Sequence, residues 1–196
     1  MFTPHELALE RGWPGRIDGD RVVQLAAQTL ESFFTGGGHA REHAEYALTD
    51  VSLRAPVLRP PSLRLFADER TFEFGNAEAI CGPEAEIRAP APVEARFCVG
   101  AVIGADEQIA GFLLVNDWHA PSLPTPKDRD FATTLGPWVE TEFDGDGFRW
   151  EAARALAARN TTLRPGDLLV GPPFAVGVSQ AAVDGLGALA AQARPA

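Results

Sequence analysis

The residues best suited to acid–base chemistry lie close together in the segment Gly111–Thr141, where Asp117 and His119 flank Trp118. An imidazole changes its charge near neutral pH, so His119 is a candidate general acid or base. Asp117 is a second candidate for carrying a proton at the same place. The plainer interpretation of His119 is a loop histidine without a chemical role, and the sequence leaves both interpretations open.

Two arginines have the chemistry to hold an anionic ligand. The guanidinium fork of Arg96 suits bidentate contact with a carboxylate, but Arg96 could instead pair with Asp117 across adjacent strands and neutralise a buried charge. Arg129 precedes Phe131–Thr134, which we expect to begin a helix. With Thr133 and the free N–H groups of that helix, Arg129 would complete an anion site; otherwise it is an ion-pairing surface residue.

Cys81 and Cys98 are the only cysteines, and their spacing does not indicate a disulfide framework. Both lie in apolar sequence, which predicts small buried thiols. The alternative for Cys98 is a nucleophilic thiolate, which would need a nearby cation such as Arg96.

The elements that must position these residues are mostly strands. Two short apolar runs, Arg96–Ile103 and Ile109–Val115, are separated by Gly104–Glu107, and this pattern predicts a hairpin. Pro137–Phe143 is expected to be another strand. Trp150–Arg159 has apolar residues on one helical face and predicts a helix.

The N-terminal part of the chain predicts a smaller unit. A turn at residues 15–19 is followed by apolar residues near helical spacing over Arg21–Phe34, with Asp20 as the expected cap. The proline-rich segment Leu53–Leu63 is typical of an extended linker. We therefore predict an N-terminal subdomain at residues 1–55 and a core at residues 56–196.

The chain has 196 residues and a formal net charge of −10, which argues against a nucleic-acid or anionic-membrane partner. A few arginines can still form a local positive pocket, so a small anionic ligand is compatible with this charge. The first residues lack the basic start and apolar run of a signal peptide, and no apolar run is long enough to cross a bilayer. We expect a cytoplasmic protein.

Four ordered pieces of sequence resemble the fumarylacetoacetate hydrolase family: GRIDGDRVVQL, LRAPVLRPPSLRLF, AVIG followed by GFLLVNDW, and FATTLGPWV with TTLRPGDLL. The resemblance implies a β-rich mixed α/β protein, with a rolled mixed β-sheet core and a small N-terminal α/β subdomain. Such proteins are usually dimeric. They use Mg²⁺ or Mn²⁺ to cleave, decarboxylate or isomerise keto acids.

The resemblance also implies that most metal ligands are missing. The position of the first ligand aspartate holds Leu65, and the positions of a glutamate pair hold Arg96 and Cys98. Shifting the register would bring in Glu94 but requires an insertion. Only Asp117 is retained, and one carboxylate cannot hold Mg²⁺ against water. We therefore expect no metal cofactor and a degenerate site.

Other family positions are kept or changed conservatively: Thr133 is retained, and Arg129 stands where a lysine is usual. The resemblance also implies that the family's lid is missing and that several loops are shortened. Our first hypothesis is a non-catalytic scaffold that forms a homodimer or pairs with a related chain. The alternative is a metal-independent enzyme or binder for a small anionic keto or enol acid. In that alternative Arg96 and Arg129 replace the charge of the ion, and Asp117 or His119 moves protons.

Overall fold

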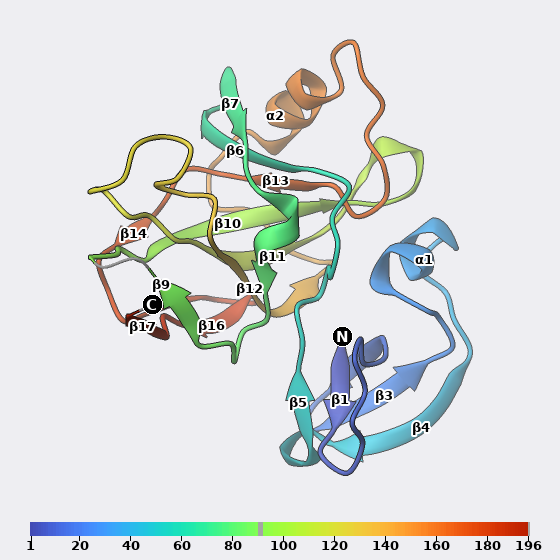
Figure 1. Ribbon diagram of the computed structural model, residues 1–196. Coiled ribbons are helices and arrows are strands. Elements are labelled where there is room, and N and C mark those ends of the chain that lie inside the picture. The colour runs from blue at the N-terminus through green and yellow to red at the C-terminus, as the bar shows by residue number, and fades with distance from the viewer. Residues whose placement is uncertain (90–91, 196) are drawn as a thin grey trace.

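Most of the regular structure is strand in the computed structural model, which describes residues 1–89 and 92–195 (Figure 1). The largest sheet has eight strands, which are β6 (Leu63–Asp68), β7 (Thr71–Phe74), β8 (Ile80–Cys81), β10 (Arg96–Ile103), β11 (Ile109–Asp117), β12 (Thr133–Glu140), β13 (Leu168–Val170) and β14 (Ala175–Val176). They lie in the order β7-β6-β13-β10-β11-β12-β8, and β14 pairs with the first two residues of β10. The pairs β13–β6 and β12–β8 are parallel and the other pairs are antiparallel. The predicted β-rich, curled mixed sheet is confirmed.

The predicted central hairpin is confirmed, and it forms the middle of this sheet. Successive side chains of a strand point to opposite faces, and both faces of β10 are buried in apolar clusters. This explains why its sequence is continuously apolar rather than alternating. The register pairs Phe97 with Asn116, so Arg96 at the start of β10 lies beside Asp117 at the end of β11.

The helix α2 (Trp150–Ala157) agrees with the prediction and packs its apolar side on the core through Trp150, Ala153 and Ala157. The prediction that a helix begins at Phe131–Thr134 is wrong, because strand β12 starts there. Thr133 and Thr134 pair in register with Asp117 and Asn116, and β-branched residues fit such a buried ladder well. An anion site at a helix N-terminus therefore does not exist beside Arg129.

The N-terminal part contains two small sheets, a short α-helix and one turn of 3-10 helix. Its elements are β1 (Phe2–Pro4), β2 (Gly15–Asp18), β3 (Arg21–Leu25), α1 (Leu30–Thr35), β4 (Glu42–Ala47), the 3-10 helix η1 (Leu48–Asp50) and β5 (Val51–Leu53). β2, β3 and β4 form one sheet, and β1 pairs with β5. Phe2, Val22 and Val51 form their own apolar cluster, while Phe34 of α1 packs against the core of the large sheet. The division at residue 55 stays a prediction.

The helix predicted over Arg21–Phe34 is wrong in its first half. Arg21–Leu25 forms β3, which makes a tight hairpin with β2 around Gly19. The α-helix begins only at Leu30, where the Thr29 side chain accepts a hydrogen bond from the Ser32 backbone N–H. The strand forms because Val22 packs in the small N-terminal cluster, and this tertiary contact outweighs the helical spacing of the sequence.

The remaining elements are short. They are η2 (Ala77–Ala79), β9 (Ile87–Ala89), η3 (Ala105–Glu107), β15 (Gln180–Val183), β16 (Gly187–Ala190) and β17 (Ala193–Pro195). β15 pairs with β16, and β17 pairs in parallel with β9. Within the described residues, no helix is both long and apolar enough to cross a membrane.

Candidate functional site

A cavity of about 440 Å³ lies where the central strand β10 begins and its neighbour β11 ends. Its charged lining residues are Arg96, Asp117, Arg129 and Glu73, which come from β10, β11, the segment before β12, and β7. Apolar side chains complete the wall, among them Leu65, Phe66, Phe72, Val170, Pro172 and Pro173. A small polar group of atoms is thus set into a mostly apolar hollow, which is the usual make-up of a ligand site.

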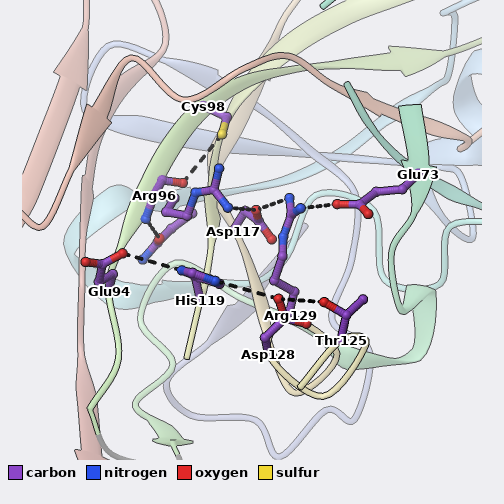
Figure 2. Close-up of polar contacts among 10 residues, drawn as sticks. Glu73, Glu94, Arg96, Cys98, Asp117, His119, Thr125, Asp128 and Arg129 are labelled. Carbon is purple, nitrogen blue, oxygen red and sulfur yellow. Dashed lines mark hydrogen bonds and ion pairs between the residues drawn. The ribbon is translucent and has the colours of Figure 1, made fainter. Parts of the chain in front are cut away.

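Asp117 forms the centre of the charged group (Figure 2). Asp117 is only 2% exposed, and Arg129 Nη2 donates a hydrogen bond to Asp117 Oδ2 at 2.6 Å. Arg96 Nη1 lies 4.0 Å from the same oxygen. The predicted proximity of Arg96 to Asp117 is therefore confirmed, but the closer partner is Arg129.

Burial raises the pKa of Asp117 above its ordinary value, against the opposing effect of the charge and hydrogen bond of Arg129 and the charge of Arg96. Attraction to arginine would lower this pKa unless burial outweighed it, and here burial outweighs it. The second oxygen, Oδ1, has no hydrogen-bond partner among the described residues. Asp117 is therefore a buried carboxyl that holds its proton more tightly than a free aspartate does.

Arg129 lies in the segment between β11 and β12, and His119 helps to hold that segment in place. Asp128 accepts a backbone hydrogen bond from Ala120 at 2.7 Å, and its Oδ2 lies 3.7 Å from His119 Nε2. The other ring nitrogen, Nδ1, lies 3.4 Å from Glu94 Oε2. His119 does not line the cavity, and its contacts are those of a residue that fixes the segment carrying Arg129.

Thr133 lies directly opposite Asp117 in the β11–β12 ladder and is 2% exposed. It is not among the residues that line the cavity. Of the five residues that the sequence suggested, the structure thus brings Arg96, Asp117 and Arg129 together at the cavity. His119 and Thr133 stand next to it.

Glu73 is a cavity residue that the sequence analysis missed. Its carboxylate accepts a hydrogen bond from Arg129 Nη1, and its side chain is 56% exposed. Glu73 lies opposite Leu65 in the β6–β7 hairpin. The turn residues at 68–70 were a usable signal for that hairpin, but the approach of Glu73 to Arg129 depends on long-range packing.

The thiol of Cys98 also lines the cavity, and burial raises its pKa to about 12, with a further contribution from the charge of Asp117. The opposing charges of Arg96 and Arg129 do not overcome these effects. Cys98 donates a weak hydrogen bond to the Arg96 carbonyl oxygen at 3.5 Å. The sulfur is therefore a buried thiol at neutral pH, and the thiolate interpretation is not supported.

The residues at the cavity do not fit the Mg²⁺ or Mn²⁺ ion that the family resemblance implies. Such an ion needs several oxygen ligands in near-octahedral arrangement. Of the two carboxylates at the cavity, that of Glu73 is paired with Arg129. The buried carboxylate of Asp117 offers one free oxygen, and its other oxygen faces the guanidinium groups of Arg96 and Arg129. Two fixed cations at this place repel a metal ion. Within the part of the chain that the structure describes, no group of three or more His, Cys, Asp or Glu side chains has ligand-like proximity.

Comparison with known proteins places the fold. No protein-family model and no curated protein sequence matches the chain. Maleylpyruvate hydrolase from Sphingobium sp. SYK-6 matches it with a TM-score of 0.79 and 20% identity, over 95% of this chain and 98% of that chain. A structure of maleylpyruvate hydrolase from the same organism in complex with manganese (II) ion and pyruvate gives 0.77 and 19%, over 94% and 96%.

A third similar structure is 5-carboxymethyl-2-hydroxymuconate delta-isomerase from Mycobacterium smegmatis, with a TM-score of 0.70 and 21% identity over 94% of each chain. These proteins belong to the fumarylacetoacetate hydrolase superfamily, so the fold that the resemblance predicts is confirmed. At these identities the likeness establishes the fold, and the activity must be argued from the site.

Proposed function

We propose that this protein binds a small 2-oxo or enol acid in the cavity without a divalent ion. The observation that carries the proposal is the convergence of Arg96 and Arg129 on one cavity with apolar walls. Two guanidinium groups supply fixed positive charge where the ligand carboxylate and carbonyl oxygen would lie. A cavity of about 440 Å³ suits a ligand of a few carbon atoms.

The reaction that this arrangement supports is keto–enol isomerisation. The Asp117 carboxylate takes a proton from the carbon next to the carbonyl, and that C–H electron pair becomes the carbon–carbon double bond of the enolate. A guanidinium group stabilises the charge that develops on the carbonyl oxygen. The same carboxyl then gives the proton to the enolate oxygen, which completes the enol; the reverse sequence returns a proton to the carbon and restores the keto form. Burial raises the pKa of Asp117, which makes its carboxylate a stronger base than a free aspartate.

Titration with 2-oxovalerate in the presence of a chelator tests this proposal. The wild type is expected to bind the ligand by calorimetry, and NMR in D₂O should show deuterium entering the carbon next to the carbonyl. Arg129→Met should weaken binding about tenfold or more, since a hydrogen bond to a charged group is lost. Lys127→Met removes a charge from the same segment, away from the cavity lining, and serves as the control. An equal loss in both variants, or full activity only with added Mn²⁺, would contradict the proposal.

The second candidate function is a non-catalytic subunit of an assembly. It is favoured by the observation that Arg129 already contacts two carboxylates of the chain itself, Asp117 and Glu73. In that case the guanidinium group only neutralises a buried charge. The titration then shows no binding of the oxo acid to any variant, while the protein remains folded.

A further inference from the structure

Glu73 brings a second carboxylate to the cavity, on the opposite side of Arg129 from Asp117 (Figure 2). The two carboxylates differ in their surroundings. The Asp117 side chain is 2% exposed, whereas that of Glu73 is 56% exposed. Glu73 therefore marks the outer end of the charged group and Asp117 marks its inner end.

The charges among the lining residues cancel. Arg96 and Arg129 are positive, and Asp117 and Glu73 are negative when ionised. A ligand carboxylate must therefore compete with a protein carboxylate for a guanidinium group. It competes more easily with Glu73, because an ion pair of a half-exposed side chain is weak. β7 is also the outermost strand of the sheet order, so the Glu73 side chain can move off Arg129 without disturbing the core, while its strand keeps it at the outer end of the cavity.

A second carboxylate on the ligand would find no favourable partner in the cavity. Among the described residues that line the cavity, no third cation is left to receive it. The displaced Glu73 carboxylate remains beside the outer end of the cavity and repels a second negative charge. Like charges that face each other across a binding site are a common source of selectivity.

From this arrangement we propose that Glu73 is a specificity-determining residue, which makes the cavity selective for monocarboxylic 2-oxo acids over dicarboxylic ones. The inference rests on the proposed function, because it concerns the ligand of the same cavity. Glu73 weakens the binding of every carboxylate by competing for Arg129. It weakens the binding of a dicarboxylate further by direct repulsion.

A matched pair of ligands tests the inference. 2-Oxovalerate and 2-oxoglutarate have carbon chains of equal length and differ in the terminal carboxylate. Both are titrated at low ionic strength into the wild type, Glu73→Gln and Glu69→Gln. Glu69 is the control because it carries the same charge in the same hairpin, but pairs with Arg149 at 3.6 Å and does not line the cavity.

The wild type should bind 2-oxovalerate about fivefold to tenfold more tightly than 2-oxoglutarate, which is the effect of one partly screened charge contact. Glu73→Gln should strengthen the binding of both ligands and bring their affinities within about twofold, whereas Glu69→Gln should keep the wild-type ratio. An unchanged ratio in Glu73→Gln, or weaker binding of both ligands, would overturn the role of Glu73 while leaving the proposed function intact. If neither ligand binds any variant, the proposed function fails and this inference fails with it.

Discussion

Asp117 is a buried carboxyl group whose nearest charged neighbours are guanidinium groups. A metal centre on this fold would need further carboxylates here, and Leu65, Arg96 and Cys98 occupy the positions that the family resemblance gives to them. The closest charge is that of Arg129, from which Asp117 Oδ2 accepts a hydrogen bond at 2.6 Å. At the scale of single residues, the site is therefore organised around fixed cations of the chain itself.

Part of this arrangement could be predicted from sequence. Arg96 and Asp117 lie on neighbouring strands of one hairpin, so their proximity follows from the hairpin register. Arg129 and Glu73 reach the same point from a loop and from the far edge of the sheet. Their convergence depends on tertiary packing over long sequence separations, and local patterns do not encode it.

The buried state of Asp117 leads to a prediction about pH and stability. Its folded-state pKa is raised above the ordinary value of about 3.8, so the folded chain keeps a proton that the unfolded chain releases. The contribution of Asp117 to stability must then fall as the pH rises from about 3.8 through the raised folded value. Each unit of increase in the pKa corresponds to about 1.4 kcal/mol.

Urea unfolding of the wild type and Asp117→Asn between acidic and neutral pH measures this effect. The stability of the wild type relative to the variant should decrease with rising pH, because asparagine does not titrate. The pKa of Asp68 is lowered, chiefly by a backbone hydrogen bond from Arg70, but this group is common to both proteins and cancels in the difference. Parallel stability curves for the two proteins would show that the proton is not held by Asp117.

The elements of the fold could be predicted where the sequence pattern was compatible with only one kind of secondary structure. The runs in β10 and β11 are apolar on both faces and are joined by a short turn, which leaves little alternative to a buried hairpin. The pattern over Arg21–Phe34 fitted a helix although it contains a strand, a loop and a short helix. Apolar residues can fall at helical spacing by chance when a strand and a helix follow each other closely. Only the packing of the strand in the N-terminal cluster distinguishes the two elements here.

The segment that carries Arg129 provides a prediction at the scale of elements. His119 contacts Asp128 and Glu94, so its removal should loosen this segment while leaving the strands intact. In His119→Ala, hydrogen exchange at the Ala120 amide, which donates to Asp128, should become about tenfold faster or more.

The strand amides of β10 and β11 serve as the internal reference for this experiment, because they lie in the buried ladder. His43→Ala, a change at an exposed residue of β4, is the matched control and should leave the segment unchanged. If Ala120 exchanges at the same rate in His119→Ala and the wild type, the contacts of His119 do not hold the segment.

At the scale of the whole molecule, we predict a homodimer or a pair with a related chain. Such pairing would cover apolar surface that is exposed in a single chain. The segment around β14 leaves Phe174, Val176 and Val178 exposed at 47%, 50% and 42%. Val176 pairs with Arg96 at the start of β10, and Phe174 and Val178 lie two positions before and after it, so three exposed apolar residues fall in one short segment next to the sheet. Exposed apolar residues of this kind favour association with another protein surface.

We therefore expect sedimentation at micromolar concentrations to show a dimer. Val176→Asp should raise the dissociation constant of this dimer about tenfold or more, because burying an unpaired charge is costly. Val178→Asp in the same segment should have a similar effect, whereas Glu142→Lys in the exposed turn after β12 should have none. A stable wild-type monomer over this concentration range would contradict self-association. Pairing with a related chain would then be the remaining form of the prediction, and mixing the two purified chains in the same instrument would test it.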